Sequence, residues 1–242
     1  MATREAFLGR VRTVMAHASP LFEATVSAKP VDLETEARER RARALGQWKG
    51  LLERFRTEFE QVGGVFHRVP DVAGAADRVV ELAARWEATR ILTWAPEILP
   101  FDLQALSRRG LGVEVASPLA MGPETRAASR AAIAGAPVGL TGADFALAET
   151  GSLVLLSGAG RGRGVSLLPP YHVAIVGKRA LLPGLADLGV ELEALHLNPD
   201  PARSGAAVQI ITGPSRTADI ELTLTRGVHG PKEVHVVFVD EL

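Results

Sequence analysis

The spacing of apolar residues changes along the chain and divides it into two parts. Residues 3–17 have helical spacing, and a proline-containing break follows over residues 20–30. Residues 32–62 predict a longer helix that begins with acidic residues and stops at a pair of glycines. Beyond this point short apolar runs alternate with helical segments, which is typical of parallel strands joined by helical crossovers. We predict an N-terminal helical arm over residues 1–62 and an α/β domain over residues 63–242.

The second part predicts an open, mixed sheet. Its first strands alternate with helices, whereas its later strands follow one another too closely for helices between them. The predicted strands are 64–69, 90–94, 112–116, 138–150, 151–158, 171–177, 207–213 and 232–240. The predicted helices are 71–87, 100–109, 123–133 and 181–196. We expect Asp71 to cap the first of these helices, whose sheet-facing residues are Val72, Ala76, Val79, Ala83 and Trp86.

A narrow apolar seam runs along the predicted second helix. Its members recur at steps of three and four residues and are Leu45, Trp48, Leu52, Phe55, Phe59 and Val62. Two interpretations are open. In the first, the helix docks on its own domain; in the second, residues 45–62 form a seam for another subunit and make a homo-oligomer.

Composition narrows the classes of partner. Lys and Arg number 27 against 28 Asp and Glu, so the net charge of -1 favours neither nucleic acid nor an anionic membrane. No apolar run is long enough for membrane insertion, and the N-terminus lacks the apolar core of a signal peptide, so we expect a cytoplasmic protein. Cysteine is absent, which excludes disulfides, thiol catalysis and iron–sulfur clusters held by this chain's thiolates.

Familiar motifs are poorly matched. The glycines of residues 157–164 do not have dinucleotide-binding spacing, and this loop is expected to be flexible with Arg161 and Arg163 in solvent; the alternative is a flap over an anionic ligand. His172, His229 and His235 do not have the spacing of a zinc site, so we expect capping or packing roles and no metal.

Polar residues interrupt the closely spaced strands GLTGADFALAETGSLVLLSG. Because strand ends in open α/β sheets build ligand crevices, we predict that this stretch lines one. Glu149 is a candidate general base, carboxylate nucleophile or polar anchor, and residue types alone do not choose among these roles. The candidate ligand-binding residues here are Thr141, Asp144, Thr150, Gly151 and Ser152.

A second polar stretch, TGPSRTADIE, contributes the rest of the predicted crevice. Ser215 and Thr217 are expected to satisfy backbone donors at a helix start or backbone nest, where Arg216 helps to hold a carboxylate or phosphate. The alternative is that Arg216 pairs internally with Asp219 or Glu149. The candidate ligand-binding residues here are Gly213, Ser215, Arg216, Thr217 and Asp219.

These stretches also carry a family resemblance. GLTGADFALAETGSLVLLSG, VSLLPPYHVAIVG and ITGPSRTADIELTLTRGVHGPKEVHVVFVD occur in order over about the last hundred residues and resemble the lactate-utilisation domain (LUD) family, in its LutC/YkgG branch. The loop GAGRGRG is richer in glycine than we expect for this family. The resemblance supplies no catalytic residue.

The resemblance implies a three-layer α/β fold of the NagB/RpiA/CoA-transferase-like type and a part in the oxidation of L-lactate to pyruvate. It also implies partner subunits that carry iron–sulfur clusters, with no cofactor bound by this chain. We therefore expect an accessory subunit that binds a small carboxylate or other anion. Two alternatives stay open: an autonomous acyl/CoA-transferase-like or hydrolase-like enzyme using Glu149, and a protein whose function is assembly through the 45–62 seam.

Overall fold

The chain forms two compact units, Met1–Asp32 and Leu33–Leu242. The computed structural model describes residues 3–17, 32–99, 102–116, 131, 133, 135–199, 203, 205, 207–218 and 224–242. The first unit contains α1 (Arg4–His17), where the sequence predicts a helix. We predict an arm that ends at residue 62, whereas the unit that holds the sheets already begins at Leu33. No helix among the described residues is long and apolar enough to cross a membrane.

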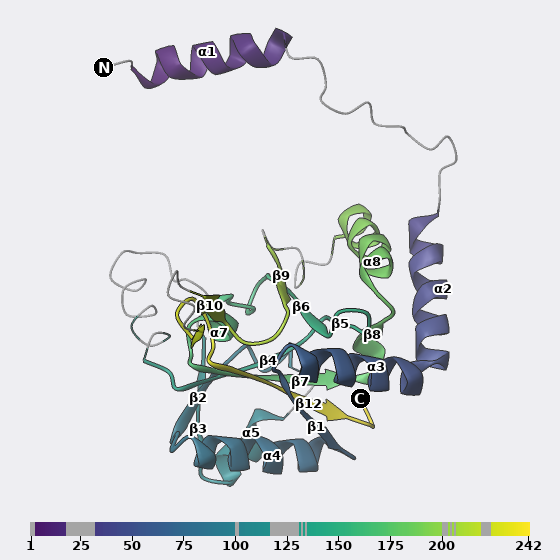
Figure 1. The fold of residues 1–242 in the computed structure, drawn as a ribbon, viewed down its shortest axis with the longest axis vertical. Helices are drawn as coiled ribbons and strands as arrows, with labels where there is room; N and C mark the ends of the chain where they lie inside the picture. Colours follow the sequence, from purple (N-terminus) through teal and green to yellow (C-terminus); the bar gives the residue numbers. More distant parts are fainter. Residues whose placement is uncertain are drawn as a thin grey trace. The chain divides into compact units, whose positions relative to one another are not determined.

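A six-stranded sheet forms the centre of the second unit (Figure 1). Its strands are β1 (Val65–Val69), β2 (Arg90–Thr93), β3 (Gly112–Val115), β4 (Val138–Gly142), β7 (Tyr171–Gly177) and β12 (Glu233–Val239). Their order is β1-β12-β7-β4-β2-β3, and every neighbouring pair is parallel. The central strands are buried, as expected for a parallel sheet covered on both faces. The predicted α/β class with an open sheet is therefore confirmed.

A second sheet holds strands that the sequence predicts in the first. Only Ala143 and Asp144 separate β4 from β5, so the chain passes directly from one sheet to the other. The second sheet has the order β8-β5-β6-β9 and consists of β5 (Phe145–Leu147), β6 (Ser152–Leu156), β8 (Leu181–Leu182) and β9 (Val208–Ile211).

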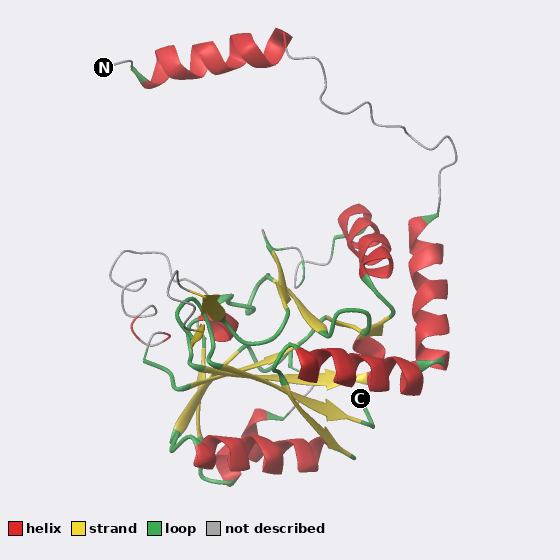
Figure 2. Cartoon of the chain, viewed as in Figure 1, coloured by secondary structure: helices red, strands yellow, loops and turns green. Residues whose placement is uncertain are grey.

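Helices cover the large sheet on both faces, as Figure 2 shows in red and yellow. On one face lie α4 (Val72–Arg85) and α5 (Leu103–Arg108); on the other lie α3 (Trp48–Gln61) and α7 (Gly164–Leu167). Asp71 caps α4 as predicted, since its carboxylate accepts a hydrogen bond of 2.7 Å from the Gly74 amide. The 3₁₀ turn η1 (Lys178–Ala180) and α8 (Leu185–Leu197) follow β7. The predicted helix 123–133 lies almost entirely outside the described residues.

The predicted long helix is two helices, α2 (Leu33–Gly46) and α3, which meet at Gln47 at a steep angle (Figure 1). Gly46 is a weak helix former at this point. The stronger reason is burial, because α3 turns to lay Leu52, Phe55 and Phe59 on the sheet at no more than 1% exposure. Trp48 stacks on Phe238 of β12 with ring centroids 6.1 Å apart. The seam on α3 therefore packs on its own domain, as in the first of our two interpretations.

The segment after Gly213 is extended rather than helical. Arg216–Ala218 form β10, which pairs antiparallel with β11 (Leu224–Arg226). The predicted helix start at this point is therefore wrong. Its polar residues are of the types that cap helices, which is why the sequence favours a helix start here. Pairing of β10 with β11 instead determines the backbone conformation.

Gly139 in β4 permits a close contact that no other residue allows. A Cβ atom there would overlap the carbonyl oxygen of Val165 in α7. We expect Gly139→Ala to lower the free energy of unfolding by about 1–3 kcal/mol because backbone must move away from backbone. Gly189 in α8 has open space around it, so Gly189→Ala should stabilise the chain by about 0.4–1 kcal/mol. Urea denaturation of both variants measures the difference, and equal effects would contradict this account.

Candidate functional site

The carboxyl ends of β2 and β4 mark a topological switch point. These strands are neighbours, but the chain leaves β2 toward β3 at one edge and leaves β4 toward β7 on the other side. Ligands of open α/β sheets bind outside the carboxyl ends of such strands. Trp94 directly follows β2, and Asp144 lies two residues beyond the end of β4. The switch point therefore brings these two side chains to one edge of the sheet.

Asp144 is the centre of a buried charge cluster. Its side chain is 4% exposed and accepts hydrogen bonds from Arg161 at 2.6 Å and from Arg203 at 3.1 Å. Its other oxygen accepts the backbone amide of Leu156 at 2.7 Å. One carboxylate thus orients two guanidinium groups and leaves the cluster with an excess positive charge. We call Asp144, Arg161 and Arg203 the Asp144 triad.

The glycine-rich loop is folded onto the switch point. Arg161, predicted in solvent, is only 11% exposed and lies over the Trp94 ring at 5.2 Å. The loop is held by the Ala95 amide, which donates to the Gly160 carbonyl at 3.0 Å, and by the Trp94 indole, which donates to the Gly162 carbonyl at 3.2 Å. Arg163 is exposed, as predicted. The prediction for Arg161 was wrong because its partners, Asp144 and Trp94, are distant in sequence.

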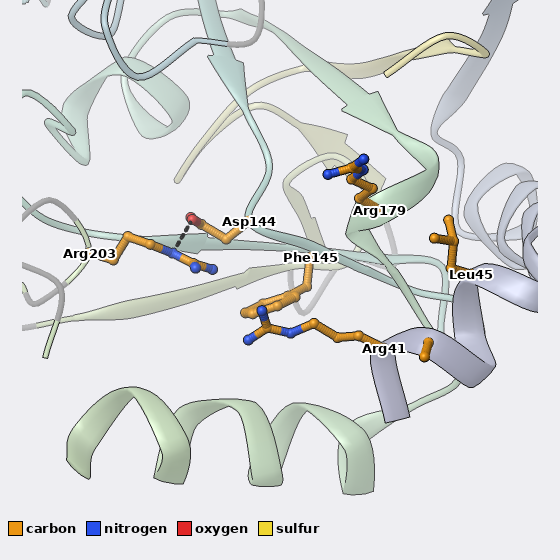
Figure 3. Close-up of a pocket in the computed structure, with 7 residues that line it drawn as sticks. Arg41, Leu45, Asp144, Phe145, Arg179 and Arg203 are labelled. Atoms are coloured by element: carbon orange, nitrogen blue, oxygen red, sulfur yellow. Dashed lines mark hydrogen bonds and ion pairs between the residues drawn. The ribbon is translucent and has the colours of Figure 1, made fainter. Parts of the chain in front are cut away.

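A pocket of about 470 Å³ opens beside the triad (Figure 3). Figure 3 shows the guanidinium groups of Arg41, Arg179 and Arg203 arranged around Phe145. Its lining residues come from α2, the β4–β5 connection, β5, η1 and the segment before β9, and they are Arg41, Ala42, Leu45, Asp144, Phe145, Arg179 and Arg203. We call this cavity the arginine pocket. Its composition suits an anionic ligand, since guanidinium groups form bidentate bonds with carboxylates and phosphates.

The arginines of this pocket differ in how they are paired. Arg41 on α2 pairs with Glu191 of α8 through two guanidinium nitrogens, and the Glu191 side chain is 1% exposed. Arg203 also lies over the Phe145 ring at 5.3 Å. Within the part of the chain that the structure describes, the Arg179 side chain makes no hydrogen bond or ion pair, and the residue is exposed. Arg179 therefore differs from Arg41 and Arg203, whose guanidinium groups already contact carboxylates.

The three arginines of the pocket are not among the site residues predicted from the sequence. Arg41 lies in the highly charged first half of the predicted helix 32–62, where any residue resembles a solvated surface position. Arg179 and Arg203 occur in short connections without a motif. Only the tertiary contacts of α2 with α8 and of Arg203 with Asp144 place them around one cavity.

A second cavity, of about 570 Å³, lies beside Arg161 of the triad. The loop Gly158–Gly164 lines it, together with Ala116, Ile133, Leu167 and Leu168. Arg161 contributes to this cavity, whereas its partner Asp144 contributes to the arginine pocket. The buried ion pair therefore stands between the two spaces.

Two groups of predicted site residues lie elsewhere in the fold. Thr141 is fully buried in β4 and shares a hydrogen bond of 2.8 Å with the Nε2 atom of His172 in β7. Ser152 joins Thr150 and Thr212 in a chain of hydroxyl groups with oxygen distances of 2.8 and 2.7 Å. Gly151 has a positive φ of 60°, and a Cβ atom there would overlap the backbone of Phe59. These residues join elements of the fold and do not line the arginine pocket.

The Glu149 side chain lies beside the N-terminus of α8. Its carboxylate accepts the Leu185 amide at 3.4 Å, and a Cβ atom on Gly184 would overlap it. The side chain is exposed. This position favours the polar-anchor role among the three that we considered, because negative charge at a helix N-terminus is stabilising. Catalysis by Glu149 stays a prediction.

The second predicted stretch contacts the end of α3. The Arg216 guanidinium donates to the carbonyl of Val62, and a Cβ atom on Gly213 would overlap that carbonyl. Ser215 accepts the amide of His229 at 3.3 Å. Thr217 lies in β10, while Asp219 lies outside the described residues. Arg216 and Glu149 thus contact different helices, and the single crevice that we predicted from both stretches is instead several separate contacts.

A half-buried histidine, His67, and a buried one, His235, are hydrogen-bonded on the α4 face of the sheet. The Nε2 atom of His67 shares a hydrogen bond of 3.0 Å with the Nδ1 atom of His235, and the Nε2 atom of His235 donates to the Glu233 carboxylate at 2.9 Å. Burial, followed by the neighbouring charge of His235, lowers the pKa of His67 to about 4. Burial also lowers the pKa of His235. Within the described ranges, no three His, Asp or Glu side chains are placed to hold a metal ion.

Known proteins from other organisms are similar to this chain in sequence. The chain is 43% identical over 106 residues to lactate utilization protein C of Halalkalibacterium halodurans, covering 44% of this chain and 45% of that one. It is 45% identical over 107 residues to the uncharacterized protein YkgG of Escherichia coli K12, covering 43% and 45% respectively. The matches thus span less than half the length of these relatives.

A solved DUF162 family protein from Deinococcus radiodurans shares the fold. It superposes with a TM-score of 0.54 at 21% identity and covers 79% of this chain and 98% of its own. The LUD domain family matches residues 52–239, which include the six strands of the large sheet and the Asp144 triad. This chain belongs to the LUD domain family.

Proposed function

We propose that this chain is the C-type component of a lactate-utilisation system and that it binds a small organic anion in the arginine pocket. The observation that carries the anion-binding part is the arrangement of Arg41, Arg179 and Arg203 around one cavity beside the buried Asp144 triad. The relatives named lactate utilization protein C support the system to which the chain is assigned.

The triad has a positioning role in this proposal. The Asp144 carboxylate accepts hydrogen bonds from Arg161, Arg203 and the Leu156 amide, so we assign it the task of orienting the two arginines. It instead holds Arg203 against Phe145 before a ligand arrives. Pre-ordered arginine side chains bind anions more tightly because less side-chain entropy is lost on binding.

Electron transfer is assigned to other proteins in this proposal. Oxidation of lactate to pyruvate releases two electrons and two protons, and the 242 residues contain no cysteine that could ligate an iron–sulfur cluster. We therefore propose that iron–sulfur subunits accept the electrons while this chain supplies the anion site.

Growth on L-lactate tests the role of the pocket. We expect Arg179→Gln, introduced at the chromosomal locus of the native organism, to slow growth on L-lactate at least about three-fold, because one charge-assisted contact with the anion is lost. Growth on glucose should not change. The matched control is Arg43→Gln, which removes an exposed arginine of α2 that pairs with Glu39. Equal growth of all three strains on L-lactate would count against the pocket.

Affinity purification tests the partners. From lactate-grown cells, the tagged chain should recover a protein that contains iron, and the eluate should oxidise L-lactate. Recovery of the chain without iron, combined with normal growth of a deletion strain on L-lactate, would reject its place in a lactate-oxidising system.

A further inference from the structure

The arginine pocket carries more positive charge than one carboxylate can neutralise. Glu191 offsets Arg41, and Asp144 offsets only one of its two arginines. Arg179 adds a further charge without an internal partner in the described parts of the chain. The lining groups and their direct partners therefore have an excess of two positive charges.

The pocket is also larger than a three-carbon acid needs. A volume of about 470 Å³ lies within the range of ligand pockets for larger organic molecules. Ala42, Leu45 and Phe145 contribute apolar surface to the lining of the pocket. An anion with an apolar part would fill this space and displace water from that surface.

We infer that the preferred ligand of the arginine pocket is an organic dianion, a dicarboxylate or an organic phosphate with an apolar part, rather than lactate itself. The inference rests on the anion-binding function proposed above. A monoanion forms one bidentate contact and leaves either Arg179 or Arg203 unneutralised, whereas a dianion contacts both. Asp144 adds selectivity for a dianion. An anion that contacts Arg203 but does not reach Arg179 lies next to the Asp144 carboxylate, which repels it.

Calorimetric titration with L-lactate and L-malate tests the charge. The two acids differ by one carboxylate on the methyl carbon. In low salt at neutral pH, L-malate should bind the full chain about ten-fold more tightly than L-lactate, since a second charge-assisted pair forms. Arg179→Gln should weaken L-malate about ten-fold and bring the two dissociation constants close together. Arg43→Gln, which lies outside the pocket, should change neither.

Titration with inorganic and phenyl phosphate tests the apolar surface of the pocket. Phenyl phosphate should bind more tightly, and Leu45→Ser should reduce its advantage without changing the affinity for inorganic phosphate. Leu45 is 39% exposed, so this substitution leaves the core intact. If phenyl phosphate binds no more tightly than inorganic phosphate, the apolar part of the inference is rejected.

The outcomes separate the inference from the proposal beneath it. If L-lactate binds as tightly as L-malate and both depend on Arg179, the anion site stands and the dianion is rejected. If neither acid nor either phosphate binds the parent chain, the dianion and the anion site are both rejected, while the growth experiment still decides the role in lactate utilisation.

Discussion

Asp144→Ala should lower the free energy of unfolding by about 3–5 kcal/mol, because it leaves buried arginine charge without its partner. Arg161 is 11% exposed and Arg203 is 22% exposed, so water compensates Arg161 least. The Leu156 amide loses its acceptor at the same time. Urea denaturation at neutral pH measures the loss.

Two comparison variants show whether the loss comes from the buried charge. Asp144→Asn retains an acceptor for the Leu156 amide, so it should lose less stability than alanine. Asp240→Ala removes a carboxylate from a pair with Arg68 whose side chains are 35% and 45% exposed, and exposed pairs contribute about 0–1 kcal/mol. If Asp144→Ala loses no more unfolding free energy than Asp240→Ala, the triad stabilises the fold no more than an exposed ion pair does.

Acidification should destabilise the chain through His172. Burial, followed by the neighbouring charge of His235, lowers the pKa of His172 to about 3, against an ordinary value of 6.5. The folded state therefore binds fewer protons than the unfolded state below pH 6.5, and stability present above that pH is lost as the pH falls toward 3. Between neutral pH and about pH 5 this histidine alone should remove about 2 kcal/mol.

The variant His172→Gln separates this effect from other acid-sensitive groups. Glutamine is neutral at both pH values and can still bond to the Thr141 hydroxyl. Between about pH 7 and pH 5 the variant should therefore lose about 2 kcal/mol less unfolding free energy than the parent chain. His196→Gln removes an exposed histidine of α8 and should lose as much stability as the parent. An identical loss in all three proteins would contradict a role for His172.

The fold class followed from local patterns. Alternation of short apolar runs with helical segments predicts a parallel sheet, and β1, β2, β3, β7 and β12 all occur where those runs lie. Asp71 caps α4 because capping depends on residues only three positions apart. Such features are determined by neighbours in the chain, so the sequence by itself is sufficient for them.

The site depended on contacts that span the chain. Asp144 was singled out because a carboxylate between buried strands must be paired. Its partners, Arg161 and Arg203, lie 17 and 59 residues away, and the bond from Arg41 to Glu191 spans 150 residues. The break between α2 and α3 likewise depends on the sheet that buries Phe55 and Phe59.

The sequence by itself therefore determined the α/β class, most element positions and the need for a partner at Asp144. The tertiary structure alone decided that the arginines of α2, η1 and the segment before β9 surround one pocket. It also decided that Glu149 and Arg216 lie at different helices. The physical reason is that hydrogen-bond periodicity and capping act over a few residues, whereas charge pairing and burial act between any residues that the fold brings together.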